Sequence, residues 1–399
     1  MKIPSIRILS SQTDVLSRQF GLRSVTPRLS LVDEIDQYTS LLFTRSWQGV
    51  GEWEFHMIGT NPTALKEGNL ILLDNDGRRA GIIRSVHIVN GSTGLETTVR
   101  GQTLNSVAAQ RCTIPLEGAA NGGYDTVPAL ESSEDSPDPV AAETILKTYA
   151  SRHLTNPLDE KRRIPLMSLA PDLQRGASGV WMSRYEQLDS VLQSVSEYLD
   201  TGWEIYLDLN MRQMIFDVLP GVNRSVGQSE NSRIIFSIDY ESVENLEYLH
   251  ELGGYKNLAY AGGAGENENR LVLKLTNESA EPTGLARFET FLDCGTLEIT
   301  ETDTALSLTE EGLHKLKEYK KTESLTGTIV QPGSFVYRKQ WDLGDLVTIV
   351  DHSSGVEQDL RISRVTERYE AQSMGIDVTF GTPPDHLGRI IRKLKTTVK

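Results

Sequence analysis

The clearest potential for chemistry lies in two glutamates on one apolar segment. Glu52 and Glu54 stand two residues apart in EWEFHM, so both side chains point to the same face of a strand. A pair of carboxylates is what a glycoside hydrolase needs, with one acting as acid and the other as nucleophile or base. Glycosidases usually draw these two groups from separate elements across a cleft. The spacing therefore favours an exposed strand face.

The cysteines and histidines give no sign of nucleophilic or metal chemistry. Cys112 would need a nearby base to act as a nucleophile, and the sequence shows none. Cys112 and Cys294 are the two cysteines of the chain, and two are too few for a disulfide framework or a structural zinc site. No histidine has metal-ligand spacing, and we expect each to be solvated. The seven histidines are His56, His87, His153, His250, His314, His352 and His386.

Two loops resemble ligand-binding motifs but lack an essential part. AGGAGENENR (Ala261–Arg270) is glycine-rich, but it lies between two strand-like runs and opens no helix that would bind phosphate. We predict a wide hairpin loop. Asp74 and Asp76 begin like a calcium loop, yet Arg79 stands where that loop needs glycine. A hairpin turn accounts for this segment. The sequence thus predicts no catalytic, cofactor-binding or metal-binding residues, and no cofactor.

Composition excludes several classes of protein. The chain has 399 residues, long enough for two or three domains, and a formal net charge of -15. A general binder of nucleic acid normally has a basic surface, so this charge argues against one. The N-terminus has no apolar core of signal-peptide length, and no stretch approaches the length of a membrane span. We expect a chain made and folded in a cytoplasm, without direct membrane insertion.

The elements that must position any site are mostly strands. Short apolar runs separated by turn signals fill the first hundred residues, which is typical of a barrel or sandwich. Residues 116–139 are rich in Gly, Ser, Pro, Asp and Glu and are predicted to be a loop or linker. Helical periodicity then predicts helices beginning at Asp138–Pro139, over residues 185–200 and over residues 308–321. A strand pair follows Gly202.

One β pattern occurs twice. Residues 65–101 and 342–381 each read as a turn followed by three strands, with Gly68 and Asn69 matching Gly344 and Asp345. The third strands end in Gly101 and Gly381. The spacings differ only inside turns, where insertions are tolerated. Either all meanders share this pattern, or the chain holds two copies of one barrel.

Four segments stand in a telling order: Val32–Met57, Gly81–Arg111, Ala286–Gly295 and the strands from Trp341 to Gly381. Together they resemble the siphophage tail-hub proteins of the ReqiPepy-type siphovirus tail protein family, and more distantly the hubs of contractile phage baseplates. Val32–Met57 resembles the start of these proteins, and Gly81–Arg111 is similar to the piece that follows. Ala286–Gly295, a helix, and then the strands from Trp341 to Gly381 resemble the closing part. The resemblance covers nearly the whole chain.

The resemblance implies an α+β, mostly β fold with two related β-barrels and an inserted α/β domain. It implies the following division: 1–115, first barrel; 116–232, first part of the insertion; 233–275, first part of the second barrel; 276–325, second part of the insertion; 326–384, second part of the second barrel; and 385–399, a basic tail. Many relatives continue into an endopeptidase, lysin or receptor-binding region. This chain ends about fifteen residues after Pro384, so we expect that region to be absent.

The family also implies a role at the tip of the virion tail of a phage or prophage, after assembly in the host cytoplasm. Its members form homotrimers, in which six barrels make a ring on the distal tail protein or tail tube. The tape measure protein and DNA pass through this ring, and a receptor-binding or lysin protein lies beyond it. We expect a non-enzymatic hub whose acidic wall keeps DNA from binding.

Two alternatives remain open. One is a tail-associated cell-wall hydrolase or endopeptidase, which needs a nucleophile or metal site that the sequence does not display. The other is a host carbohydrate-binding module, in which Trp47, Trp53 and Trp341 would stack on sugars. The same three tryptophans are more often found packed inside a β core.

Overall fold

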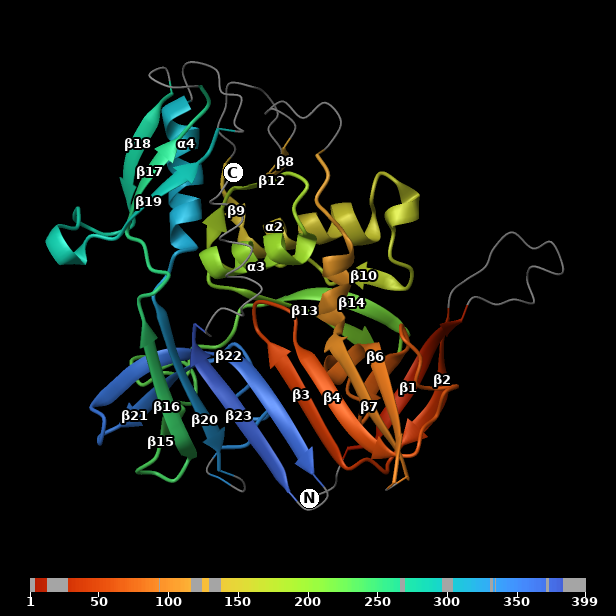
Figure 1. Ribbon diagram of the computed structural model, residues 1–399. Coiled ribbons are helices and arrows are strands. Elements are labelled where there is room, and N and C mark those ends of the chain that lie inside the picture. Colours follow the sequence, from red (N-terminus) through yellow and green to blue (C-terminus); the bar gives the residue numbers. More distant parts are fainter. Residues whose placement is uncertain are drawn as a thin grey trace.

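The computed structural model describes residues 4–12, 28–92, 94–115, 124–128, 138–265, 270–295, 304–330, 333, 335–370 and 373–382. Within them lie one large sheet in two halves, an α/β unit over one end of it, and a small sheet with its own helix (Figure 1). The predicted α+β, mostly β class is confirmed. The predicted basic tail, 385–399, lies outside the described residues.

The first half of the large sheet alternates buried and exposed side chains along its strands. In β3 the inward residues are Leu41, Phe43 and Arg45, and the first two pack in a core with Trp53 and Phe55 of β4. This period of two is what a half-buried strand requires. The strands of this half are β1 (Ile6–Gln12), β2 (Arg28–Ile35), β3 (Ser40–Ser46), β4 (Glu52–Ile58), β5 (Leu70–Leu73), β6 (Ala80–Gly91) and β7 (Gly94–Thr103).

The second half of the sheet has its own core around Phe236, Trp341 and Phe380. Its strands are β15 (Ile235–Ser237), β16 (Val243–Glu251), β20 (Thr322–Ile329), β21 (Leu346–Asp351), β22 (Val356–Glu370) and β23 (Met374–Gly381). We name β5, β6 and β7 the first meander, and β21, β22 and β23 the second meander. Figure 1 shows the two halves side by side, the first in red to orange and the second in green to blue.

The two meanders open with the same hydrogen bonds. Gly68 N donates to Ile83 O at 2.9 Å, and Gly344 N donates to Ile362 O at 2.8 Å. Each isoleucine N donates back to the residue after the glycine, Asn69 or Asp345, at 2.9 and 2.8 Å. The glycines have φ of +88° and +89°, a conformation that disfavours any side chain. The predicted match of these two turns is confirmed.

A bulge follows at the same place in both meanders. The register between β6 and β7 shifts after Ile83, and that between β22 and β23 shifts after Ile362. Ile83 faces Gly101, whereas Ile362 faces Phe380, so Gly101 matches Phe380 and not Gly381 as the sequence suggested. The error is one residue, and it arose because both third strands contain a glycine near their ends. The repeat itself is confirmed in its register.

The halves are joined rather than closed. Among the described strands the order is β16-β20-β23-β22-β3-β4-β7-β6-β5-β1-β2, with β21 beside β22 and β15 beside β21. Pairing of β22 with β3 makes the sheet continuous from one half to the other. The finer prediction of two barrels is not confirmed, because hydrogen bonds between described strands close neither half on itself.

The α/β unit covers the outer face of the first meander. Leu70, Leu72 and Ile82 point into its core, opposite to Ile71 and Leu73, which face the core of the sheet. The unit comprises α2 (Ala142–Ala150), α3 (Leu188–Tyr198), the strands β8 (Asp125–Val127), β9 (Val140–Ala141), β10 (Met167–Leu169), β11 (Ser178–Gly179), β12 (Trp181–Ser183), β13 (Gly202–Asp208) and β14 (Gln213–Leu219), the 3-10 turns η2 (Leu104–Gln110) and η4 (Glu160–Arg162), and the π-helical turn η3 (Ser151–Thr155). The 3-10 turn η1 (Gly77–Arg79) belongs to the first meander, where it joins β5 to β6.

The helices of this unit begin later than predicted. Asp138 and Pro139 do not start a helix, because Val140 and Ala141 form β9 and pair with β11. The helix therefore begins at Ala142. The strand pair predicted after Gly202 is confirmed as β13 and β14.

A small sheet stands apart from both halves. Its strands β17 (Leu258–Gly262), β18 (Val272–Thr276) and β19 (Glu289–Asp293) pack on helix α4 (Thr304–Lys317), with the 3-10 turn η6 (Gly284–Ala286) before β19. β17 and all but the last residue of β18 lie within 233–275, but the two strands pair here and not with the second meander. The domain boundaries drawn from the resemblance stay a prediction.

Candidate assembly site at the junction of the meanders

The junction begins with backbone pairing between two segments far apart in the chain. β22 and β3 run antiparallel, from Arg364 opposite Ser46 to Glu370 opposite Ser40. The first six residues of β22 pair with β21, and β3 pairs with the later part of the same edge of β22. Thr44 and Thr366 share a hydrogen bond between their hydroxyls at 2.9 Å. The junction therefore repeats ordinary sheet geometry between the two halves.

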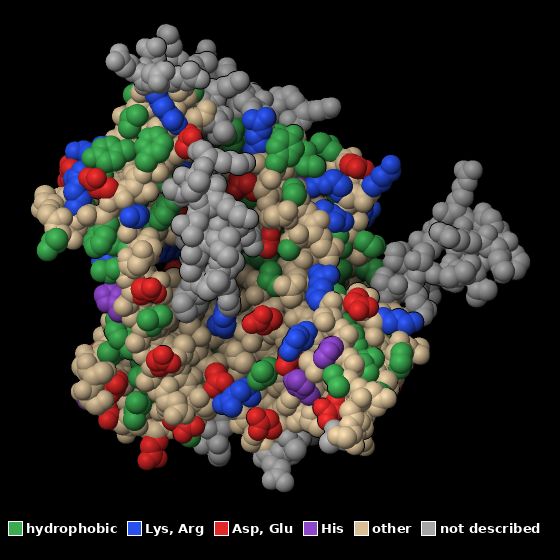
Figure 2. All heavy atoms as spheres, viewed as in Figure 1, with side chains coloured by type: hydrophobic (Ala, Val, Ile, Leu, Met, Phe, Trp, Pro, Cys, Tyr) green, Lys and Arg blue, Asp and Glu red, His purple; other side chains and the backbone are tan. Residues whose placement is uncertain are grey.

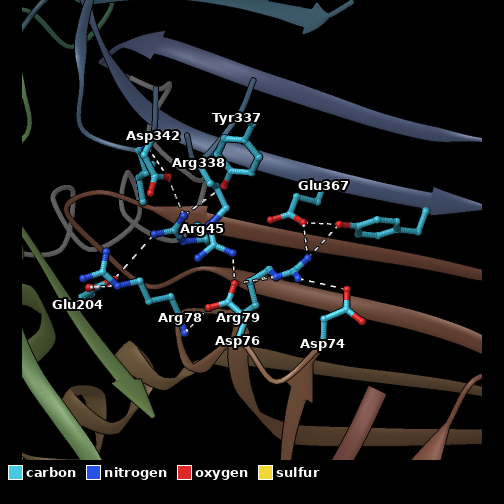
Figure 3. Close-up of polar contacts among 12 residues, drawn as sticks. Arg45, Asp74, Asp76, Arg78, Arg79, Glu204, Tyr337, Arg338, Asp342 and Glu367 are labelled. Atoms are coloured by element: carbon cyan, nitrogen blue, oxygen red, sulfur yellow. Dashed lines mark hydrogen bonds and ion pairs between the residues drawn. The ribbon is translucent and has the colours of Figure 1, made fainter. Parts of the chain in front are cut away.

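A buried charge network crosses this junction (Figure 3). Arg79 of η1 donates to Glu367 of β22 at 3.0 Å and to the Tyr369 hydroxyl at 3.1 Å. Only 2% of the Glu367 side chain and 12% of the Arg79 side chain are exposed. Tyr369 in turn donates its hydroxyl proton to Glu367. Arg79 also pairs with Asp76 at 3.0 Å. These contacts tie the turn of the first meander to the central strand of the second.

A second cluster lies beside the first and reaches the α/β unit. Arg45 of β3 donates to Asp342 at 2.8 Å and to the Tyr337 hydroxyl at 3.1 Å. It also lies 3.8 Å from Glu204 of β13, which pairs with Arg78 at 3.1 Å. Figure 3 shows these side chains converging from β3, the η1 turn, β13 and the segment before β21.

The electrostatics of this cluster follow from burial. Burial opposes the charge on Arg45, but the oxygens of Tyr337 and Asp342 outweigh it and raise the pKa of the guanidinium. Burial raises the pKa of the Glu204 carboxyl. Arg78 and Arg45 lower this pKa, but they offset only part of the rise. Glu204 Oε1 accepts no well-oriented hydrogen bond, although Arg78 lies close to it. Removing one partner of such a buried ion pair typically lowers the free energy of unfolding by about 3–5 kcal/mol.

This arrangement supplies cohesion rather than a reaction. Its charged groups are already paired with one another. The small space among Arg45, Arg78 and Glu204 has a volume of about 20 Å³, room for a water molecule and not for a substrate. In the described part of the chain, no group of three or more His, Cys, Asp or Glu residues is placed to bind a metal ion.

The candidate residues read from the sequence do not come together. Glu54 binds Arg100 and His56, which lower the pKa of its carboxyl against the opposing effect of burial. Glu52 is exposed on the same strand. The thiol of Cys112 accepts a hydrogen bond from the Gln187 amide at 3.3 Å. Cys294 is buried, which raises the pKa of its thiol to about 11.

The loops and aromatic residues also find structural roles. Asp74 and Asp76 pair with Arg79, as a turn rather than a calcium loop would have them. The tryptophans proposed to stack on sugars are buried, with 2% of Trp47, 3% of Trp53 and 1% of Trp341 exposed. The centre of the glycine-rich loop, residues 266–269, lies outside the described residues.

The expectation that every histidine is solvated was wrong for His153 and for His314, whose ring packs against Trp181 and Tyr198. His153 is 2% exposed, and its Nε2 lies 2.7 Å from Asp125. The π-helical turn after α2 brings it inward, where the Asp125 carboxylate binds Nε2 and the buried Nδ1 has no hydrogen-bond partner among the described residues. His386 lies outside the described residues.

Sequence reasoning missed the junction residues, although a signal existed. Arg45 follows Leu41 and Phe43 at the inward spacing of β3, and Glu367 stands between Val365 and Tyr369 at the inward spacing of β22. A charged residue at an inward position of a strand requires a buried partner. The two partners come from segments about 290 residues away, and their identity needs the fold.

The comparisons with known proteins agree with this architecture. Two solved structures share the fold: the 43 kDa tail protein of prophage MuSo2 from Shewanella oneidensis, and prophage tail protein gp18 from Listeria monocytogenes EGD-e. Each is 10% identical with a TM-score of 0.51. The likeness covers 94% of this chain and 97% of the first protein, and 99% of this chain and 99% of the second. No curated protein matches this chain.

The family model of siphovirus ReqiPepy6 Gp37-like proteins matches residues 22–382, which is most of the chain. No helix among the described residues is long and apolar enough to span a membrane. The resemblance seen in the sequence and the expected place in the virion tail are confirmed. The chain belongs to the siphovirus ReqiPepy6 Gp37-like family of phage tail proteins.

Proposed function

We propose that the chain is a structural hub of the tail tip, which acts as a homotrimer. The observation that carries this proposal is the repeated meander, with the same opening turn and the same bulge in each half. Three copies of a chain with two similar halves present six similar units in a ring. Such a ring matches a sixfold partner, the distal tail protein or a ring of the tail tube.

The proposed role is passive during ejection. The tape measure protein and then DNA pass through the ring, and a tip protein, receptor-binding or lysin, lies beyond it. The net charge of -15 supports this role, because an acidic channel repels the phosphate backbone. Figure 2 shows charges of both signs interspersed over one face, so the excess acid is not gathered in one patch there.

The role proposed is non-enzymatic. The polar groups brought together at the junction are paired with one another, and the candidate carboxylates on β4 lie on one strand. Release of fragments from purified cell wall by the pure chain would overturn this part of the proposal. Glycan binding by the pure chain would favour the carbohydrate-binding alternative. The three tryptophans on which that alternative was based are buried.

The test is the state of assembly. We expect the full chain at high concentration, or together with the distal tail protein, to have the mass of three copies. Electron microscopy should then show a ring with a central channel and sixfold-like projections. A chain that stays monomeric even in the presence of its tail partners would contradict the proposal.

A further inference from the structure

The junction between β22 and β3 has a counterpart in two strand edges that no described residue of the chain pairs with. The matching register makes β6 the counterpart of β22, and β16 the counterpart of β3, because β4 and β20 border β7 and β23 alike. Among the described residues, the strand from Ser85 to Gly91 pairs only with β7. Within the same described set, β16 pairs only with β20. Both edges of a second junction are therefore present in each chain, but the described residues of one chain do not pair them with each other.

These edges expose hydrophobic side chains at positions whose counterparts in the junction of β22 with β3 are buried. Ile88 matches the buried Glu367, and Tyr248 matches the buried Phe43. Their exposed fractions are 45% for Ile88 and 42% for Tyr248. Val89 and Leu249 beside them are 47% and 37% exposed. Free edges are normally protected by lysine, proline or bulges. Residues 85–91 contain neither lysine nor proline, and the bulge after Ile83 has its match in β22, which pairs with β3 all the same.

The opening turns of the two meanders differ in the same way, since one is covered and the other is open. At the made junction, Trp47 N donates to Ser363 O at 3.0 Å, and the indole covers Gly344 so closely that a Cβ there would lie 2.4 Å from Nε1. The counterpart turn at Gly68 is open, since no atom of the described residues lies within 4 Å of a Cβ built on it. The residue equivalent to Trp47 is Leu252, which follows β16 and is 40% exposed.

We propose that the edge of β6 pairs antiparallel with β16 of a second copy of this chain, which seats Leu252 of that copy near Gly68. This inference rests on the proposed ring and adds its contact. The register is transferred from the made junction. It places Ile88 opposite Tyr248 of the next copy and Ser85 opposite Glu251 of the next copy.

A second copy is the occupant that the observations favour. The two edges are counterparts of two strands that already pair inside the chain, so each copy carries both halves of the contact. The contact joins different surfaces of the two copies, and such heterologous contacts close into rings when the rotation permits. Each chain would then contain one junction within itself, between β22 and β3, and form one with the next copy, between β6 and β16. Every unit of the ring would therefore have the same neighbours.

The test uses pairs of cysteines in the full chain. Ile88→Cys with Tyr248→Cys, and Ser85→Cys with Glu251→Cys, place thiols directly opposite each other between copies. The exchanged pairs, Ile88→Cys with Glu251→Cys and Ser85→Cys with Tyr248→Cys, use the same four positions but separate the thiols by three residues, about 10 Å. A disulfide requires Cα atoms within about 7 Å. Single variants and the unaltered chain, which retains Cys112 and Cys294, are oxidised in parallel.

We expect the two opposite pairs to give disulfide-linked multimers, and the exchanged pairs to give no more than the single variants. An equal mixture of the Ile88→Cys and Tyr248→Cys single variants should yield linked dimers that always contain one of each. If a three-copy ring forms but only the exchanged pairs link, or none do, this inference fails while the proposed ring stands. If no multimer forms at high concentration or in assembled tails, the ring fails as well.

Discussion

The indole of Trp47 lies against Gly344, the residue that opens the second meander. Gly68 opens the first meander with nearly the same φ, +88° against +89°, but has open space where Gly344 has the indole. A comparison of the two positions therefore distinguishes two reasons why a position requires glycine. Backbone conformation requires it at both positions, and close packing requires it at only one.

Replacing each glycine by alanine should show this difference. Both variants impose left-handed strain of about 1–2 kcal/mol. Only Gly344→Ala also forces Trp47 to move, and overpacking of this kind typically costs about 1–3 kcal/mol more. We therefore expect urea unfolding of the monomeric chain to show a larger loss for Gly344→Ala than for Gly68→Ala. Equal losses would mean that the Trp47 contact contributes nothing to the constraint.

The buried pair of Arg79 and Glu367 should be important for the union of the halves. Arg79→Met leaves the Glu367 carboxylate buried without its cation, which typically costs about 3–5 kcal/mol in the free energy of unfolding. The matched control is Arg100→Met, which breaks an exposed pair with Glu54 and should cost less than about 1 kcal/mol. Chemical unfolding followed by tryptophan fluorescence compares the two. Similar small losses in both variants would show that Glu367 is compensated by its other partner, Tyr369.

The Glu204 carboxyl should make stability depend on pH in an unusual direction. Burial raises its pKa in the folded chain above the ordinary value, so between these two values the folded state binds the proton better. Stability from this group is therefore present below the ordinary pKa and lost as the pH rises through the raised value. Relative to wild type, Glu204→Gln should gain stability as the pH rises across this window.

Unfolding curves at a series of pH values from 4 to 8 test this expectation. The exposed Glu230→Gln variant removes the same charge elsewhere and serves as the control. The difference between Glu204→Gln and wild type should grow with pH and then level off, whereas Glu230→Gln should follow wild type throughout. A difference that shrinks as the pH rises would show that Arg45 and Arg78 hold the carboxylate more strongly than burial opposes it.

The sequence predicted what is local and repeated, and it failed where distant segments meet. Strand alternation and turn glycines located the meanders, since Gly68 and Gly344 need their φ whatever surrounds them. The parallel pairing of β17 with β19 was not predicted, because the sequence of a short apolar strand does not specify which strand it pairs with. The helix start at Asp138 was displaced by a tertiary contact, the pairing of β9 with β11. Arg45 and Glu367 were overlooked for the same reason, since their partners are known only once the halves are joined.

Helix α4 should detach more easily from the α/β unit at acidic pH because of His314. Its ring meets the Trp181 ring edge-on, with centroids 3.9 Å apart, and lies beside Tyr198. Burial lowers the pKa of His314 to about 4, and the neighbouring lysines act in the same direction. The unfolded chain then takes up a proton first as the pH falls, so stability is complete above about 6.5 and declines as the pH falls toward 4.

NMR titration of the His314 ring should give a midpoint near 4, and unfolding should require less urea at pH 5 than at pH 7. The His314→Gln variant keeps a polar side chain that does not titrate in this range, so its stability should fall less between these two pH values. A ring midpoint at or above 6.5 would contradict the prediction, because it would mean that the charged imidazolium is accommodated between Trp181 and Tyr198. Cation–π attraction to the two rings would then outweigh the loss of solvation.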